Sequence, residues 1–176
     1  AFVRSANVMR RRPDGKWHGD MCDGQAHVAA MQAKGCTFSG RRALLAGDGG
    51  AGSAIGHALV QAGVAELAIH DSDATRRDAL VARLSALGTC AVRAGSGDPR
   101  GFDIVSNATP LGMREGDPLP FDVSGLDAAS FASCVVTVPA VTPWIAAARA
   151  RGCPTSTGMD MFVSVRDLMI DALLQP

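Results

Sequence analysis

The chain has 176 residues, of which 47% are hydrophobic and 19% are charged, a balance typical of a folded globular protein and not of a disordered segment. Basic and acidic residues number 17 each, so the formal net charge is zero and no nucleic-acid-binding surface is indicated. No apolar stretch reaches the roughly 18–20 residues of a membrane span, and no signal peptide is present, so we expect no membrane contact. We interpret the basic run Arg10-Arg11-Arg12 as a solvated strand end rather than a phosphate-binding patch.

The cysteines and histidines indicate neither disulfides nor a metal site. Five cysteines are scattered without a C-x-x-C pair, which is typical of reduced thiols in a cytoplasmic protein. Four histidines show no metal-ligand spacing, so no metal is expected. Because the chain begins with Ala, partway into an apparent strand, we expect it to be a fragment of a longer protein.

Strands and helices are predicted to alternate along most of the chain. The predicted elements are strands at 2–9 and 16–18, a helix at 23–34, a strand at 42–46, a helix from 54 to 60, a strand at 65–70, a helix at 75–87, strands at 89–93 and 102–106, a long loop at 109–131, a strand at 134–138, a helix at 142–150, a strand at 153–156 and a helix at 161–174. This alternation favours a parallel sheet covered on both faces. Right-handed crossovers then give a Rossmann-type, doubly wound α/β fold.

The turn after strand 42–46 carries the strongest functional signal. Its sequence, Gly47-Asp48-Gly49-Gly50-Ala51-Gly52, fits G-x-G-x-x-G, and Asp71 follows 19 residues after Gly52. In a dinucleotide site, Gly47 permits the tight turn, Gly49 lets the backbone approach the pyrophosphate, and Gly52 lets the helix pack against the strand. The helix N-terminus attracts phosphates, and Asp71 would accept hydrogen bonds from a ribose diol. The alternative is a glycine-rich turn without a ligand. A kinase-type P-loop is excluded, because no Gly-Lys-Ser/Thr follows.

Several motifs resemble, in order along the chain, those of the shikimate/quinate dehydrogenase family. The matching stretches are Ser5–Val8, Pro13–Gly15, Gly19–Gly24, Gly47–Gly52, Asn107–Met113, Gly116–Pro120, Pro139 with Thr142-Pro143, and Gly158 with Met161. The resemblance implies an NAD(P)-dependent oxidoreductase of the shikimate pathway of aromatic amino acid biosynthesis, located in the cytoplasm. It implies hydride transfer between a nicotinamide and the ring hydroxyl or ketone of a shikimate-like acid, and it allows a homodimer of the full-length protein. Residues 1–22 would be a remnant of an N-terminal substrate-binding domain, and 23–176 the NAD(P)-binding domain.

The resemblance also implies roles for single residues around the substrate. Asp23 matches the Asp of the family's acid–base pair, which is needed because a proton must move at oxygen when hydride moves at carbon. The family's partner Lys lies in an N-terminal domain that is not matched here, and neither Lys16 nor Lys34 stands in a matching context. Asn7 matches a substrate-binding Asn, and Thr137 replaces a substrate-facing Tyr. Two alternatives stay open: Asp23 only caps the helix that follows it, and Asn7 is only a turn or edge residue.

A larger set of residues is expected to contact the cofactor. These residues are Gly47, Asp48, Gly49, Gly50, Ala51, Gly52, Asp71, Ser72, Asp73, Arg76, Asn107, Ala108, Thr109, Pro110, Leu111, Val135 and Gly158. NADP-preferring relatives carry Asn-Arg-Thr where this chain has Asp71-Ser72-Asp73, and their Arg holds the 2′-phosphate. Two carboxylates would repel that phosphate, so we expect NAD rather than NADP. Arg76 and Arg77 stand nearby and keep NADP binding open.

Two departures from the family bear on the substrate. Thr137 in place of Tyr, and Val165 in place of Gln, remove donors for a polyhydroxylated carboxylate, so a related and less polar ring acid is also credible. A second hypothesis, from another class, is a non-catalytic NAD-binding module. A third, an NADP-dependent reductase of unrelated substrate, leaves Asn107–Met113 and Asp23 unexplained.

Overall fold

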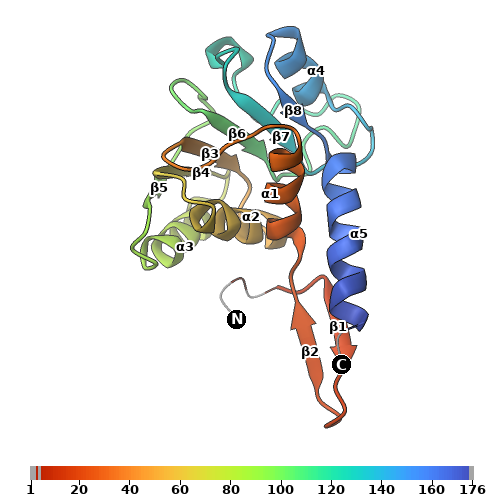
Figure 1. Ribbon diagram of the computed structural model, residues 1–176. Helices are drawn as coiled ribbons and strands as arrows, with labels where there is room; N and C mark the ends of the chain where they lie inside the picture. Colours follow the sequence, from red (N-terminus) through yellow and green to blue (C-terminus); the bar gives the residue numbers. More distant parts are fainter. Residues whose placement is uncertain (1–2, 4, 175–176) are drawn as a thin grey trace.

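Strands and helices alternate through most of the computed structural model, which describes residue 3 and residues 5–174 (Figure 1). The elements are β1 (Val8–Arg11), β2 (Trp17–Asp20), α1 (Asp23–Ala33), β3 (Arg42–Ala46), α2 (Gly50–Gln61), β4 (Glu66–His70), α3 (Ala74–Ser85), β5 (Ala91–Ala94), β6 (Ile104–Asn107), the 3₁₀ turn η1 (Val123–Gly125), β7 (Phe131–Cys134), α4 (Pro143–Ala150), β8 (Thr155–Ser156) and α5 (Gly158–Leu174). The alternation predicted from the sequence is therefore present.

Six strands form one parallel sheet in the order β5-β4-β3-β6-β7-β8. Along the chain, β4 and then β5 are added on one side of β3. The chain then returns to the other side of β3, where β6, β7 and β8 follow in order. This reversal confirms the predicted Rossmann-type, doubly wound fold. It also leaves a crevice at the carboxyl ends of β3 and β6, the usual ligand position in such sheets.

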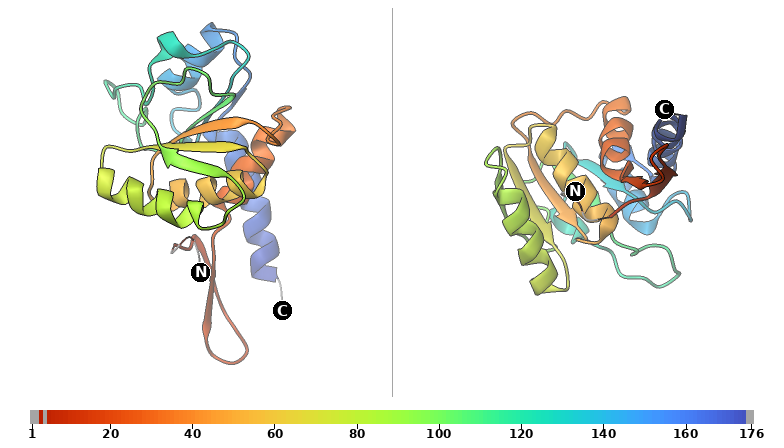
Figure 2. Two further views of the ribbon diagram at one scale, coloured as in Figure 1. Left: turned by 90° about the vertical axis from the view of Figure 1, so that its left-hand side faces the viewer. Right: turned by 90° about the horizontal axis from the view of Figure 1, so that it is seen from below.

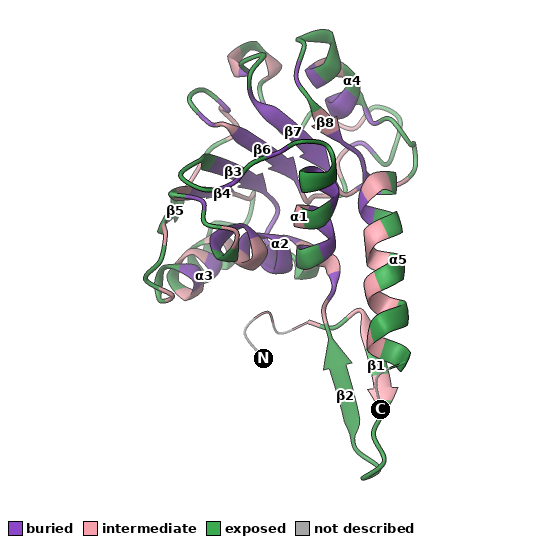
Figure 3. Ribbon diagram, in the orientation of Figure 1, coloured by how far each residue is buried: buried purple, intermediate pink, exposed green. Residues whose placement is uncertain are grey.

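Apolar cores cover the sheet on both faces, because successive side chains of each strand point to opposite sides. Leu45 shares one buried cluster with Ile55 of α2 and Leu84 of α3. Its neighbour Leu44 belongs to a second cluster, with Trp144 of α4. The sheet is accordingly buried along most of its length (Figure 3). A strand buried on both faces explains the unbroken apolar run at 43–46.

Strands β1 and β2 form an antiparallel hairpin outside this sheet. The hairpin extends from the body beside α5, which contacts β1 (Figure 2). All four residues of β2 are exposed. The predicted turn at Arg12–Gly15 is confirmed, whereas the strands were placed too early: β1 begins at Val8 and β2 ends at Asp20. Part of the predicted strand 2–9 lies outside the described residues.

The prediction for the strand at 134–138 was wrong, because β7 covers Phe131–Cys134. The β-branched residues at 135–138 have the higher strand propensity, but β7 must pair in register with β6 and ends where Cys134 lies opposite Asn107. The last helix begins earlier than predicted, at Gly158. Thr157 and Asp160 fix this start, since the Asp160 Oδ2 atom accepts from Thr157 N at 2.8 Å and Thr157 Oγ1 accepts from Asp160 N at 3.3 Å.

No helix within residue 3 and residues 5–174 is long and apolar enough to cross a membrane. Across the same residues, no cluster of His, Cys, Asp or Glu could hold a metal ion. All five cysteines are free thiols.

Candidate functional site

A cavity of about 650 Å³ occupies the crevice at the carboxyl ends of β3 and β6. Its lining comes from the turn after β3, the end of β4 and the loop after β6. The lining residues are Ala46, Gly47, Gly49, Gly50, Ala51, His70, Asp71, Ser72, Arg76, Ala108, Thr109, Pro110, Leu111 and Pro120. Eleven of the predicted cofactor residues are among them. The other six, which do not line the cavity, are Asp48, Gly52, Asp73, Asn107, Val135 and Gly158.

Three glycines give the turn after β3 its shape. Gly47 has a φ of 100°, a left-handed conformation that favours glycine. A Cβ atom on Gly52 would lie 2.1 Å from the carbonyl oxygen of Gly47, so only glycine lets α2 start this close to the strand end. A Cβ atom on Gly49 would meet nothing within 4 Å, which means that its backbone borders open space. This is the geometry that the sequence pattern predicts.

The N-terminus of α2 is suited to an anion. Its N-cap residue is Gly49, and no side chain accepts a hydrogen bond there. The first turn of the helix also carries no acidic residue. The unpaired N–H groups and the partial positive charge of the helix dipole are therefore available to a phosphate.

The loop after β6 forms the facing wall of the cavity and is shaped by Asn107. The fully buried Asn107 accepts hydrogen bonds at Oδ1 from Thr109 N (3.0 Å) and Thr109 Oγ1 (2.6 Å). Its Nδ2 atom donates to the carbonyl oxygen of Leu111 at 3.1 Å. Asn107 thus supports the cavity wall from beneath, while residues 108–111 line the cavity.

Asp71, at the end of β4, is held as a hydrogen-bond acceptor at the rim. Its Oδ2 atom accepts from Asp48 N at 3.0 Å and its Oδ1 atom from Asp73 N at 2.9 Å. Burial works to raise the pKa of Asp71, but these two N–H donors and the charge of Arg76 outweigh it and lower the pKa. Asp73 serves a different purpose, because its side chain caps α3 by accepting from Arg76 N at 3.0 Å.

Asn7 and Asp23 form a second cluster where the hairpin meets α1. Asn7 Nδ2 donates to Asp23 Oδ1 at 2.6 Å, and Asn7 Oδ1 accepts from Cys22 N at 3.0 Å. The interpretation of Asp23 as a helix cap was wrong, since Cys22 is the N-cap residue and no side chain caps the helix. Burial raises the pKa of Asp23, and the hydrogen bond from Asn7 opposes this shift in part.

This cluster lies close to the glycine turn, although neither Asn7 nor Asp23 lines the cavity. Gly24 packs so closely on α2 that a Cβ atom there would lie 2.3 Å from the carbonyl oxygen of Ala54. A Cβ atom on Gly50, which lines the cavity, would lie 3.4 Å from Ser5 Oγ and 3.7 Å from Met21 Cε. Ser5 and Met21, each two residues before a member of the Asn7–Asp23 pair, therefore approach the glycine turn.

Comparison with known proteins agrees with this geometry. No protein-family model matches the sequence. The chain is 40% identical over 126 residues to the shikimate dehydrogenase (NADP(+)) of Rubrobacter xylanophilus, an alignment covering 66% of the chain and 43% of that protein. It is 31% identical over 167 residues to the enzyme of the same name from Paracoccus denitrificans, covering 93% of the chain and 59% of that protein. The chain belongs to the shikimate/quinate dehydrogenase family.

Solved structures of similar proteins share the fold. Quinate dehydrogenase from Corynebacterium glutamicum in complex with NAD has 29% identity and a TM-score of 0.83, over 96% of this chain and 62% of that one. The 5-ketofructose reductase of a Gluconobacter strain has 27% identity and a TM-score of 0.88, over 98% of this chain and 64% of that one. The chain thus spans about half of the curated relatives described above, 43% and 59% of their lengths.

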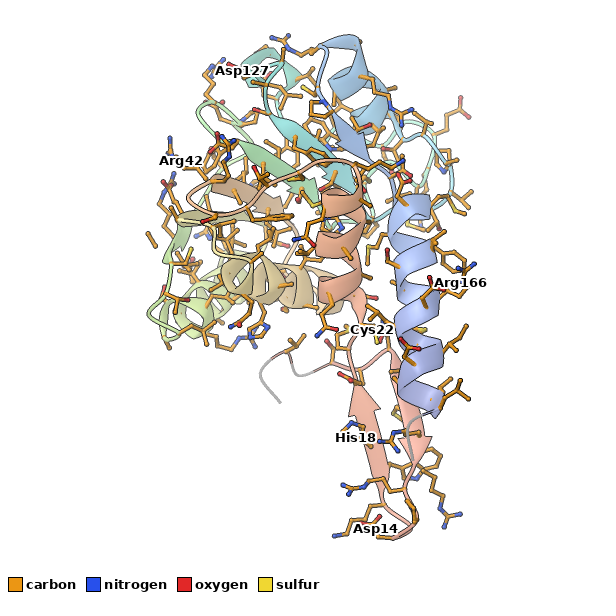
Figure 4. All side chains as sticks on the ribbon, viewed as in Figure 1. Asp14, His18, Cys22, Arg42, Asp127 and Arg166 are labelled. Atoms are coloured by element: carbon orange, nitrogen blue, oxygen red, sulfur yellow. The ribbon has the colours of Figure 1, made fainter. Side chains whose placement is uncertain are left out.

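The remaining residues singled out for the family's chemistry do not line the cavity. Lys34 ends α1, eleven residues and about 16 Å along the helix from Asp23, and pairs with Asp160 at 3.1 Å. Lys16 adjoins the hairpin turn, whose Asp14 lies at the far tip from Cys22 (Figure 4). Thr137 is half-buried beyond the end of β7. Gly158 packs against the backbone beside Val135, where a Cβ atom would lie 2.6 Å from the Val135 carbonyl oxygen.

Two features were missed in the sequence. A buried chain of polar side chains crosses the core: His27 Nε2 lies 3.0 Å from Ser133 Oγ, which lies 2.7 Å from Ser106 Oγ. The complete burial of His27 lowers its pKa from 6.5 to about 4. The second feature is an ion pair between Asp48 and Arg76. No local pattern signals either one, because both depend on residues far apart in the chain.

Proposed function

We propose that this chain is the cofactor-binding part of a dehydrogenase that transfers hydride reversibly between a nicotinamide and a ring carbon of a shikimate-like hydroxy acid. The observation that carries the proposal is the junction of two sites: the Asn7–Asp23 pair adjoins the glycine turn through Ser5 and Met21. A dehydrogenase of this kind needs a proton-transfer group beside its dinucleotide site.

The residues of the cavity fit a dinucleotide. The N-terminus of α2 would hold the diphosphate, and Gly49 leaves the backbone open to it. Asp71, kept ionised by its N–H donors, would accept hydrogen bonds from the adenosine ribose. When bound, the nicotinamide would accept or supply the hydride.

Asp23 would handle the proton at the substrate oxygen. Its partial burial and raised pKa suit a group that exchanges a proton with a bound substrate. Asn7 fixes the carboxylate by donating to one oxygen, which leaves the other for the substrate. Because Lys16 and Lys34 both lie away from Asp23, neither supplies the second member of the family's acid–base pair.

We further propose that residues 1–22 belong to a substrate-binding unit and that residues 23–176 form the cofactor domain. In support, the β1–β2 hairpin takes no part in the six-stranded sheet and exposes all of β2. The substrate we infer is a ring acid somewhat less polar than shikimate. Thr137 lacks the phenol that the family presents there, and Val165 packs against α1 in the cluster of Ala26 and Ala30.

NAD is the cofactor that we favour over NADP. The names of the curated relatives specify NADP(+), whereas the related quinate dehydrogenase structure is a complex with NAD. In this chain, Asp71 and Asp73 stand at the ribose end of the cavity, where a 2′-phosphate would add negative charge.

Amide NMR of the isotope-labelled chain tests the proposal. NAD should shift the signals of residues 47–51, 71–72 and 108–111, and quinate or shikimate added afterwards should shift those of Asn7 and Asp23. Shifts confined to other surfaces, such as the outer face of α3, would contradict the assignment. A matched titration with AMP should reproduce the shifts at 71–72 and leave Asn7 and Asp23 unchanged.

A further inference from the structure

We propose that Asp48, the second residue of the glycine turn, is a specificity-determining residue for the cofactor: it holds Arg76 in an ion pair and so withholds this guanidinium from a 2′-phosphate. The inference rests on the proposed function and names the residue that decides its cofactor.

Arg76 is the group that a 2′-phosphate would need. It is the one arginine among the described residues that line the cavity, and no lysine lines it. The bidentate N–H groups of arginine suit a phosphate. Judged by the lining alone, the chain would therefore be able to bind NADP.

The ion pair with Asp48 opposes this role of Arg76. Arg76 Nη2 donates to Asp48 Oδ1. The Asp48 side chain is 0% exposed, while the Arg76 side chain is 59% exposed, so the pair joins a buried carboxylate to a surface cation. Asp48 Oδ2 has no hydrogen-bond donor. If Arg76 turned to a phosphate, Asp48 would be left buried without a partner, which strongly opposes the movement.

The surrounding charges act in the same direction. Burial raises the pKa of Asp48, the hydrogen bond from Arg76 lowers it, and the nearby charge of Asp71 raises it again. The hydrogen bond and charge of Asp48, followed by the charges of Asp71 and Asp73, raise the pKa of Arg76. Three carboxylates thus act on the Arg76 guanidinium. A 2′-phosphate, with nearly two negative charges, would meet an excess of negative charge.

Asp48 also contacts Asp71, through its backbone and not through its side chain. The backbone N–H of Asp48 donates to Asp71 Oδ2 at 3.0 Å, and the Asp48 carbonyl oxygen accepts from Ser53 Oγ at 3.1 Å. Any amino acid other than proline keeps these backbone bonds. A substitution at position 48 can therefore release Arg76 while leaving Asp71, and with it ribose recognition, in place.

The test is calorimetric titration of NAD and NADP into the 176-residue chain and its Asp48→Ala, Arg76→Ala and double variants, each checked for folding by circular dichroism. Asp48→Ala should raise the ratio of NADP to NAD affinity about tenfold, the order expected of one released charge-assisted hydrogen bond. The gain should vanish in the double variant. Arg76→Ala alone should barely change this ratio, because Arg76 is already occupied.

Other results would overturn the inference. If Arg76→Ala alone weakens NADP binding tenfold, Arg76 serves the phosphate despite Asp48. If Asp48→Ala binds NADP no better, the ion pair does not set specificity. Asp48→Asn, which keeps the side-chain shape and removes the charge, should shift NADP affinity in the same direction and replaces Asp48→Ala should the latter fail to fold. A chain that binds NAD while these variants gain nothing overturns this inference alone, whereas a chain that binds neither dinucleotide overturns the proposed function with it.

Discussion

Asn7, just before β1, donates a 2.6 Å hydrogen bond to Asp23, the first residue of α1. The same Asn7 side chain accepts from Cys22 N, so it fixes both the carboxylate and the start of the helix. Asp23 lies in the first turn, where the helix dipole stabilises negative charge, yet it caps nothing. Its carboxylate is thus held by Asn7 without capping the helix.

Replacing Asp23 by Asn should therefore affect turnover rather than folding. In the complete protein we expect Asp23→Asn to lower kcat for its ring hydroxy acid by about 10²–10⁴, the usual loss of a general acid–base group. The melting temperature and the affinity for NAD should stay nearly unchanged, because no helix cap is removed. Asp14→Asn, in the exposed hairpin turn, is the matched control and should retain full activity. An Asp23→Asn enzyme with ordinary turnover would remove Asp23 from the mechanism.

Two glycine-to-alanine variants should separate binding from folding. Gly49→Ala adds a methyl group into open space at a φ of −62° and ψ of −167°, which alanine tolerates, so the melting temperature should hold. The same methyl group would face the diphosphate and should weaken NAD binding by about tenfold or more.

Gly52→Ala should do the reverse. Its Cβ atom would lie 2.1 Å from the carbonyl oxygen of Gly47, so the turn must move and the melting temperature should fall. Thermal unfolding and calorimetry on both variants check this pair. A Gly49→Ala chain that binds NAD like the unmodified chain would show that the diphosphate lies elsewhere.

His27 should make the fold sensitive to acid. Its pKa is about 4 in the folded chain and 6.5 ordinarily, so protonation favours the unfolded state. Its contribution is complete above pH 6.5 and is lost as the pH falls from 6.5 towards 4. At 1.36 kcal/mol per pKa unit, the loss amounts to about 3 kcal/mol.

Urea unfolding between pH 7 and pH 4 checks this expectation. His27→Gln, which can still bond Ser133, should show a shallower fall in unfolding free energy than the unmodified chain. His18→Gln, on the exposed strand β2, is the control and should follow the unmodified chain. Parallel curves for His27→Gln and the unmodified chain would mean that His27 does not drive the acid sensitivity.

Substituting the two residues that follow β4 should change the preference between the two cofactors. Asp71→Asn with Ser72→Arg removes one carboxylate and adds a phosphate partner, so the ratio of NADP to NAD affinity should rise by about tenfold or more. Calorimetry with both cofactors measures the ratio. Ser72→Ala is the control, since it removes a hydroxyl without altering charge. An unchanged ratio in the double variant would place the adenosine ribose away from Asp71.

The sequence predicted those parts of the fold that depend on local patterns. Residues 43–46 are apolar because β3 is buried on both faces, and the turn at Gly47–Gly52 needs glycines for reasons that act within a few residues. The end of β7 could not be predicted in this way, since the register with Asn107 of β6 sets it.

Pairs of side chains that are far apart in the sequence could not be predicted for the same reason. Asp48 and Arg76 are 28 residues apart, and His27 and Ser133 are 106 apart. The sequence predicted that Asp48 and Arg76 each contact the cofactor, but not that they contact each other. Their ion pair depends on how closely α3 approaches the glycine turn, which no spacing rule provides.

The central claim is that the cavity at the carboxyl ends of β3 and β6 binds NAD in preference to NADP. Calorimetric titration of the unmodified 176-residue chain with both cofactors, at one salt concentration, tests it most directly. We predict that NAD binds more tightly, because Asp71 accepts from the ribose diol and Asp48 occupies Arg76. Equal or tighter binding of NADP would contradict the account.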